Sequence, residues 1–125
     1  MKKIEIKTEK APLPIGAYSQ GLIVGSRIYV AGQGPLDPET GKFPEGIEEQ
    51  TRQVLKNIRN ILVEGGATLD DVVKMTAHLT NFEDFSGYDR VCKEILKPPY
   101  PTRTTVCSGL NKILVEVDVI AELDQ

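Results

Sequence analysis

The chain has 125 residues, 40% of them hydrophobic, and its 15 Lys and Arg against 18 Asp and Glu give a formal net charge of −3. This length predicts one domain over residues 1–125, and the negative charge argues against a nucleic-acid-binding surface, which needs clustered Lys and Arg. There is no long apolar run for a transmembrane helix, no apolar signal segment at the start, and only two cysteines, so we expect a cytoplasmic protein that folds without disulfides and does not enter a membrane.

Short strands and turns are predicted for the N-terminal third. Lys3 to Lys7 alternates polar and apolar side chains, which is typical of a strand. The apolar runs 22–24 and 27–31 flank Gly25-Ser26, a pair that predicts a two-residue hairpin turn. A further turn is predicted at 37–41, where proline and glycine stand in positions that a turn favours.

Two amphipathic helices follow. From Gly46 to Glu64 the apolar side chains recur at helical spacing, so one stripe of this helix is expected to be buried, and Gly65-Gly66 ends it. Asn81 is expected to cap a second helix, which a proline-rich segment ends. The apolar stripe of this second helix comprises Phe82, Phe85, Tyr88, Cys92, Ile95 and Leu96.

The remaining segments predict strands. Val73, Met75, Ala77 and Leu79 alternate with polar residues, which indicates a strand with one core face and one polar face. Residues 102–107 and 113–123 are β-rich and predict two more strands. With two helices set among these strands, the order predicts an α+β fold in which both helices pack on one face of a mixed sheet.

The opposite sheet face is expected to be polar and uncovered. The side chains predicted on it are Thr76, His78, Thr80, Glu116 and Asp118. A wide exposed sheet face in a small domain usually packs against a partner, so we expect a homo-oligomer.

Four residues are candidates for ligand binding or acid–base chemistry. Arg103 lies among uncharged neighbours, and its guanidinium can hold a carboxylate through two hydrogen bonds; a surface arginine or a structural ion pair is the alternative. Glu116 could be a general base if partly desolvated, or a solvated position on an alternating strand. Gly32 could present a backbone N–H to an anion, or it could simply stand at the end of a strand. Tyr18 could form the wall of a pocket, or it could pack in an interface. Residue types alone assign no reaction.

Metal and nucleophile candidates are few. One histidine, His78, and two cysteines, Cys92 and Cys107, are too few for a four-ligand zinc site unless carboxylates substitute. Cys107 has no visible activating base, and Cys92 lies on a helix stripe that is expected in the core. No metal site is therefore expected.

Taken together, these segments resemble the RidA family (reactive intermediate deaminase A), also called the YjgF family. The match runs nearly end to end, and its specific part is the early Gly-x-Tyr with the later Pro-x-Arg and Val-Glu-Val. The stretches that carry it are Pro14-Ile15-Gly16-Ala17-Tyr18-Ser19-Gln20, Tyr29-Val30-Ala31-Gly32-Gln33-Gly34-Pro35, Asp37-Pro38-Glu39-Thr40-Gly41, Pro101-Thr102-Arg103 and Val115-Glu116-Val117.

The resemblance implies a chorismate-mutase-like α+β fold and a homotrimer whose sheets form a central barrel, with a cleft between each pair of neighbouring subunits. It also implies a hydrolytic deaminase of the 2-iminobutanoate/2-iminopropanoate type. Such an enzyme converts 2-imino and enamine acids, including 2-aminoacrylate, to 2-oxo acids and ammonia. Pyridoxal-phosphate dehydratases that act on serine or threonine release these intermediates. No metal or cofactor is implied.

The family's site residues carry over onto five positions. By resemblance, Arg103 would hold the substrate carboxylate and Glu116 would activate the attacking water. Gly32 and Thr105 would offer backbone groups to the substrate, and Tyr18 would wall the pocket. An iminium carbon is already electrophilic, so an oriented water can replace a strong nucleophile.

Four departures from the family pattern bear on the site. Ala31 stands where many members have serine, Thr105 where active members commonly have cysteine, and Asp89 where asparagine is frequent. The loop between Arg103 and Glu116 is also shorter. Two other functions compete: an endoribonuclease or translation inhibitor, against which the negative charge argues, and a non-catalytic ligand-binding module, which would keep Arg103 but not need Glu116.

Overall fold

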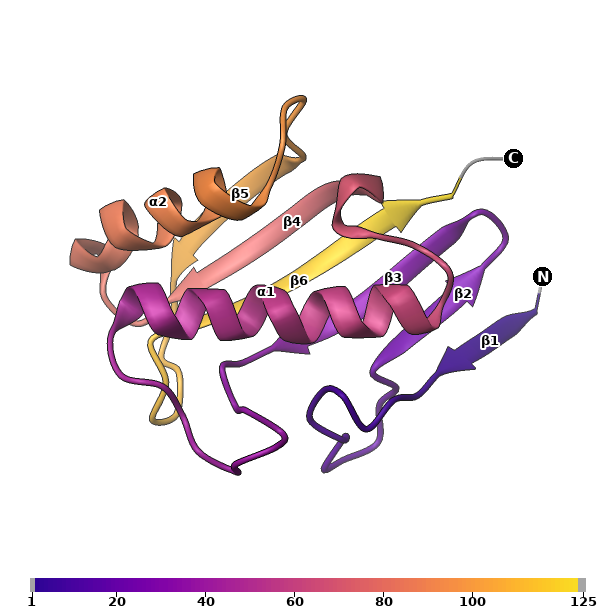
Figure 1. Ribbon diagram of the computed structural model, residues 1–125, viewed down its shortest axis with the longest axis horizontal. Helices are drawn as coiled ribbons and strands as arrows, with labels where there is room; N and C mark the ends of the chain where they lie inside the picture. The colour runs from indigo at the N-terminus through magenta and orange to yellow at the C-terminus, as the bar shows by residue number, and fades with distance from the viewer. Residues whose placement is uncertain (1, 124–125) are drawn as a thin grey trace.

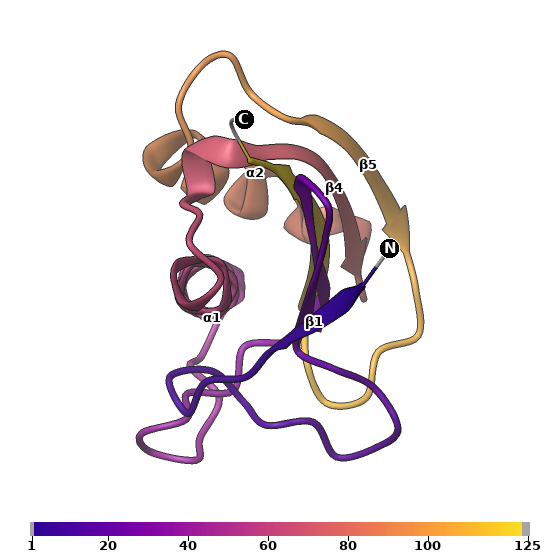
Figure 2. The same cartoon turned by 90° about the vertical axis from the view of Figure 1, so that its right-hand side faces the viewer.

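The computed structural model describes residues 2–123, which form one six-stranded mixed sheet with two helices on one of its faces (Figures 1 and 2). The order across the sheet is β1-β2-β3-β6-β4-β5, and β4 and β5 are its parallel pair. The predicted α+β fold is confirmed. The strands are β1 (Lys3–Ile6), β2 (Gly21–Val24), β3 (Arg27–Gln33), β4 (Val72–Leu79), β5 (Thr102–Cys107) and β6 (Val115–Glu122). The helices are α1 (Ile47–Glu64) and α2 (Phe85–Ile95), with short 3₁₀ turns η1 (Leu69–Asp71) and η2 (Phe82–Asp84).

The first three strands form an antiparallel meander. Val24 pairs with Arg27, so Gly25-Ser26 is the two-residue turn that the sequence predicted. Gly25 adopts a φ of 61°, a left-handed conformation that glycine reaches without a steric penalty. The hydroxyl of Ser26 donates to Glu122 at 2.7 Å, which ties this turn to the end of β6.

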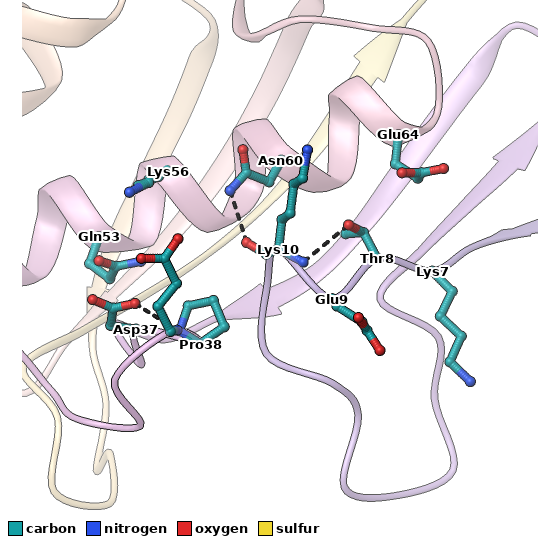
Figure 3. Close-up of a pocket in the computed structure, with 11 residues that line it drawn as sticks. Lys7, Thr8, Glu9, Lys10, Asp37, Pro38, Gln53, Lys56, Asn60 and Glu64 are labelled. Atoms are coloured by element: carbon teal, nitrogen blue, oxygen red, sulfur yellow. Dashed lines mark hydrogen bonds between the residues drawn. The ribbon is translucent and has the colours of Figure 1, made fainter.

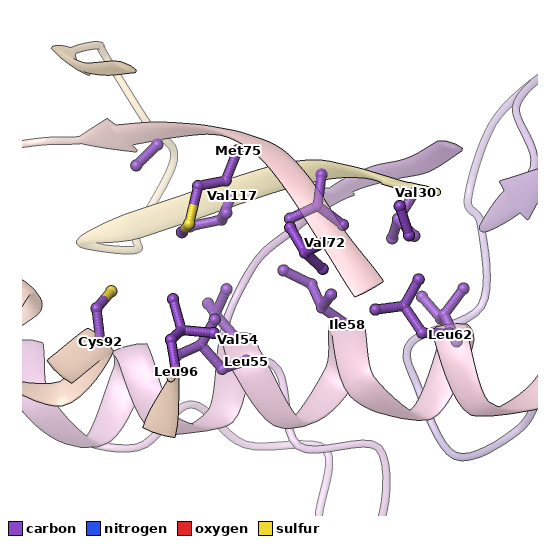
Figure 4. Packing of buried hydrophobic residues seen from close by; sticks show 14 of the residues in the cluster. Val30, Val54, Leu55, Ile58, Leu62, Val72, Met75, Cys92, Leu96 and Val117 are labelled. Carbon is purple, nitrogen blue, oxygen red and sulfur yellow. The ribbon is translucent and has the colours of Figure 1, made fainter. Parts of the chain in front are cut away.

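Helix α1 supplies the centre of the core. Its buried stripe faces β3 and β6, as the helical spacing predicted (Figure 4). Each large aliphatic side chain buried there stabilises the fold by about 1.5–3 kcal/mol. The stripe consists of Val54, Leu55, Ile58, Ile61 and Leu62, and it meets Ile28, Val30, Val117 and Val119 of the sheet.

Helix α2 lies beside α1 on the same face of the sheet (Figure 2). Asn81 caps the η2 turn rather than α2 itself, because its side chain accepts from the backbone N–H of Glu83. Tyr88 and Cys92 are buried, as the stripe predicted. None of the helices within residues 2–123 combines the length and the apolar character needed to cross a bilayer.

Strand β4 corrects one detail of the sequence analysis. Val73, expected on the core face, is 47% exposed, and Val72 is buried instead. The cause is a register shift in the β4–β6 pairing between Val72 and Lys74, which moves Val73 out of phase. From Met75 onward the predicted alternation is confirmed.

Around β4 and β6, the sheet face away from the helices carries the polar side chains that were predicted there. Thr76 pairs with Asp118 and His78 with Glu116, and all four side chains are half-buried. Thr80 lies just beyond β4, where its hydroxyl donates to the carbonyl of Ile113 at 2.7 Å. The helices leave this face open in the single chain (Figure 2).

Candidate functional site

The five predicted site residues fall into two groups on opposite faces of the sheet. Arg103 pairs with Met75, whose side chain is buried under the helices, so Arg103 and Thr105 point to the helix face. Glu116 pairs with His78 on the other face, and β4 separates β6 from β5. One chain therefore does not bring Arg103 and Glu116 together.

The guanidinium of Arg103 is fixed by α2. Its Nη1 donates to Asp89 Oδ1 at 2.8 Å, and its Cζ lies 5.4 Å from the ring centre of Phe85 and 5.3 Å from that of Tyr88. Such cation–π contacts hold a cation against the ring faces. Neither Nε nor Nη2 donates to an oxygen of residues 2–123, and the side chain is 26% exposed. Nε and Nη2 form one edge of the guanidinium, and this edge remains for a ligand carboxylate.

Asp89 carries a negative charge beside this cation. Its hydrogen bond with Arg103 lowers the pKa of the carboxyl below its ordinary value, and Lys93 adds to the effect. The Lys93 ammonium lies 3.4 Å from Oδ2. In the sequence Asp89 stands out only as a departure from the family pattern, because nothing in the sequence shows that α2 packs it against β5.

Three side chains behind Arg103 stay uncharged. Burial raises the pKa of the Tyr88 phenol and raises that of the Cys92 thiol to about 11, so neither ionises near neutral pH. The hydroxyls of Tyr88 and Thr105 are buried with no hydrogen-bond partner among the described residues. Tyr88 was predicted only as a core residue on the apolar stripe of α2. Its spacing from Phe85 nevertheless already placed both rings on one face of the helix.

A cavity of about 270 Å³ opens beside Arg103, between α2 and the strands β4 and β5. Its wall combines three charged side chains with apolar ones. The lining residues are Met75, Asp89, Cys92, Lys93, Leu96, Tyr100, Pro101 and Arg103. The volume suits a small organic acid.

A larger groove, of about 580 Å³, lies between the N-terminal loop and α1 (Figure 3). The side chain of Asn60 donates to the Lys10 carbonyl at 2.8 Å and so ties the loop to the helix. The groove contains none of the predicted site residues. We therefore place the candidate site at the smaller cavity, where a fixed cation meets an apolar wall.

Glu116 and Gly32 form the second group. A bulge in β3, between Val30 and Gln33, brings Gly32 against the carboxylate of Glu116. A Cβ at position 32 would lie 2.8 Å from Glu116 Oε2 and 3.1 Å from Cδ. Glycine at this position lets the carboxylate lie directly on the β3 backbone.

Tyr18 lies on a loop that is tied to the same bulge. The backbone N–H of Ala31 donates to the carbonyl of Gln20 at 2.9 Å. The buried side chain of Gln20 accepts from the N–H of Thr8 and donates to the carbonyl of Pro12. The phenol ring is 52% exposed, so it is available to a ligand or a neighbouring chain. Within residues 2–123 no cluster of His, Cys, Asp and Glu has the make-up of a metal site.

Comparison with known proteins shows the family. The model of the family described as Endoribonuclease L-PSP matches residues 8–123. A RutC family protein of Pyrococcus abyssi is 49% identical over 97% of this chain and 98% of its own length. The Escherichia coli protein named "Putative reactive intermediate deaminase TdcF" is 38% identical over 97% of each chain. The crystal structure of E. coli TdcF with bound serine has a TM-score of 0.92 at 35% identity, covering 98% of this chain and 100% of that one. Across its whole length, this chain belongs to the RidA/YjgF family.

Proposed function

We propose that this protein hydrolyses 2-imino acids and their enamine tautomers, such as 2-aminoacrylate, 2-iminopropanoate and 2-iminobutanoate, to 2-oxo acids and ammonia. The observation that carries the proposal is Arg103, a cation held in place with its Nε/Nη2 edge facing no acceptor oxygen of the described chain, beside a small cavity. Relatives named as reactive intermediate deaminases, and a serine-bound relative of closely similar fold, support it.

The chemistry needs a positioned water and a bound carboxylate. The water oxygen adds to C2 of the protonated imine, a proton moves to the nitrogen, the C2–N bond breaks, and ammonia leaves as C2 becomes a carbonyl. No electrons are exchanged with another reactant. Arg103 holds the carboxylate, and each charge-assisted hydrogen bond of this kind contributes about 1.5–3 kcal/mol. Glu116 orients and activates the water.

The site is shared between subunits. Arg103 and Glu116 lie on opposite faces of one sheet, so they can act on one substrate only if they come from different copies. We therefore propose a homotrimer whose sheets form a central barrel. The polar face around Glu116 is then covered, and Tyr18, Gly32 and Glu116 of one copy meet Arg103 and Thr105 of the next.

An endoribonuclease, the activity in the family model's description, has less support in this chain. The larger groove places Lys7, Lys10 and Lys56 among acidic side chains. Mixed charges of this kind do not make the basic stripe that phosphate binding needs.

The direct test is the release of 2-oxo acid and ammonia from a freshly generated imine. A pyridoxal-phosphate dehydratase acting on threonine supplies the imine, and the rate above spontaneous hydrolysis is measured. The wild type should accelerate release, and Arg103→Ala should lose about 100-fold or more of that acceleration, because two charged hydrogen bonds disappear.

The matched control is Arg90→Ala, an exposed arginine on α2 that pairs with Glu48. This variant should keep wild-type activity. No acceleration by a wild-type chain of verified trimeric mass, tested with several imines, would rule out the deaminase and favour a non-catalytic ligand-binding module.

A further inference from the structure

We propose that Asp89 makes the Arg103 site selective for zwitterions, that is, for acids that carry a cationic nitrogen beside their carboxylate. The protonated imine is such a molecule, and the 2-oxo acid product is not. The identity of the substrate rests on the proposed function, whereas the preference for a zwitterion rests on the charges that α2 and β5 place side by side.

Asp89 and Arg103 form a fixed pair of opposite charges. Asp89 Oδ1 accepts from Arg103 Nη1 at 2.8 Å, and both residues line the cavity between α2 and β5. The rings of Phe85 and Tyr88 hold the guanidinium where it is. Arg103 therefore cannot bind a ligand carboxylate without Asp89 beside it.

Both charged groups keep capacity for a ligand. Nε and Nη2 of Arg103 donate to no oxygen within the described chain. A carboxylate has about four acceptor sites, and Asp89 uses one for Arg103 and faces Lys93 at 3.4 Å with its other oxygen. The Lys93 side chain is 68% exposed, so solvent weakens its hold on Asp89.

This arrangement treats substrate and product differently. A 2-oxo acid gains the attraction of Arg103, and a weaker one from the solvated Lys93, but meets the repulsion of Asp89. A 2-iminio acid presents its carboxylate to Arg103 and an N–H to Asp89, so both charges find partners. A neighbouring carboxylate also favours the protonated, electrophilic form of the imine.

The apolar residues that line the cavity indicate which side chain the bound acid carries. Met75 and Cys92 are buried to within a few per cent, and Leu96 lies beside them (Figure 4). These three residues expose little surface, so an aliphatic side chain on the acid would leave water mainly by packing against Tyr100, which is 52% exposed and also lines the cavity. The ligand class is accordingly a small 2-iminio or 2-ammonio acid with an aliphatic side chain.

The experiment compares two probes with the same carbon skeleton, L-2-aminobutanoate as the zwitterion and 2-oxobutanoate as the anion. Their dissociation constants are measured at neutral pH by calorimetric or NMR titration. Asp89→Asn should weaken the zwitterion about tenfold and tighten the anion about tenfold, since one charged hydrogen bond is lost and one repulsion removed. Asp70→Asn, which removes the same charge from an exposed position in η1, should change neither.

Three results would overturn the inference: a wild-type chain that does not bind L-2-aminobutanoate, a wild-type preference for 2-oxobutanoate, or an Asp89→Asn variant in which both probes shift in the same direction. The last would mean that Asp89 only orients Arg103. If the preference inverts, with the wild type favouring L-2-aminobutanoate and Asp89→Asn favouring 2-oxobutanoate, but the wild type hydrolyses no imine, the proposed function fails and the inference stands. If imines are hydrolysed without inversion, only the inference fails.

Discussion

The two faces of the sheet hold their charged side chains in different ways. On the helix face, Arg103 has a carboxylate partner and two aromatic rings from its own chain. On the outer face, Glu116 and Asp118 form no ion pair within residues 2–123, and neighbouring strands leave them half-buried. The single chain therefore orients Arg103 by itself. In the proposed trimer, a neighbouring copy would supply the surface that faces the outer carboxylates.

Mixing two inactive variants gives the largest effect that this comparison predicts. Arg103→Ala and Glu116→Ala should each be nearly inactive alone. In a trimer that contains both chains, one interface joins an intact Arg103 to an intact Glu116. A random one-to-one mixture should therefore regain about a quarter of the wild-type sites. The measurement is imine hydrolysis after co-expression of the two chains with different tags.

The control mixes Arg103→Ala with a chain that carries both substitutions, since no interface in that mixture has an intact Arg103. Activity in the first mixture and none in the second would confirm a shared site. If both mixtures stayed inactive, the proposed division of the site between copies would be wrong. A Glu116→Ala chain that hydrolyses imines at the wild-type rate would exclude Glu116 as the group that activates water.

A methyl group at Gly32 should separate activity from stability on the outer face. The new Cβ of Gly32→Ala would meet the carboxylate of Glu116 at 2.8 Å, and the flexible end of that side chain can move aside. Displacing a general base by this much should lower kcat about tenfold, a fraction of the full contribution of such a base. The melting temperature should hardly change.

Gly109→Ala is the matched control, because a Cβ at position 109 has open space around it. It should leave both kcat and the melting temperature as they are. Unchanged kcat in Gly32→Ala would show that Glu116 works from another position, and a large loss of stability would show that the bulge itself depends on glycine.

Much of the fold could be predicted because its signals are local. The spacing of apolar side chains in 47–64 sets the buried face of α1, and Gly25 sets the hairpin. Val73 was wrongly predicted on the core face because a register shift in the pairing of β4 with β6 turns its side chain outward. Pairing between distant strands cannot be seen in the local sequence pattern.

The candidate site was predicted less completely, for the same reason. The uncharged neighbours of Arg103 made it a candidate, with a surface arginine or a structural ion pair as the alternative. Its partners Asp89, Phe85 and Tyr88 come from α2, which the sequence did not indicate. Which face Arg103 points to depends on the pairing of β5 with β4. The separation of Arg103 from Glu116 therefore followed from the sheet order and not from the sequence.

The smallest effect expected concerns Asp118 on the outer face. Burial raises the pKa of this carboxyl above its ordinary value of 3.8, against the opposing influence of His78 and Lys74. A raised pKa means that the folded chain binds the proton more tightly than the unfolded chain, so stability falls as the pH rises through that window. Asp118→Asn should remove this loss of stability. We expect a rise in the melting temperature of only about 1 °C at pH 7, because the carboxylate is half-buried and solvent still screens it.

The pH dependence of this gain tests how the outer face is covered. Well below pH 3.8 Asp118 is protonated in both the folded and the unfolded chain, so the wild type and Asp118→Asn should have the same melting temperature there. A gain at pH 7 that grows with protein concentration would mean that association buries the carboxylate further. A lower melting temperature for Asp118→Asn at pH 7 would instead mean that the charge has a cationic partner on a neighbouring copy, and the two faces would then differ only in which chain supplies the partner.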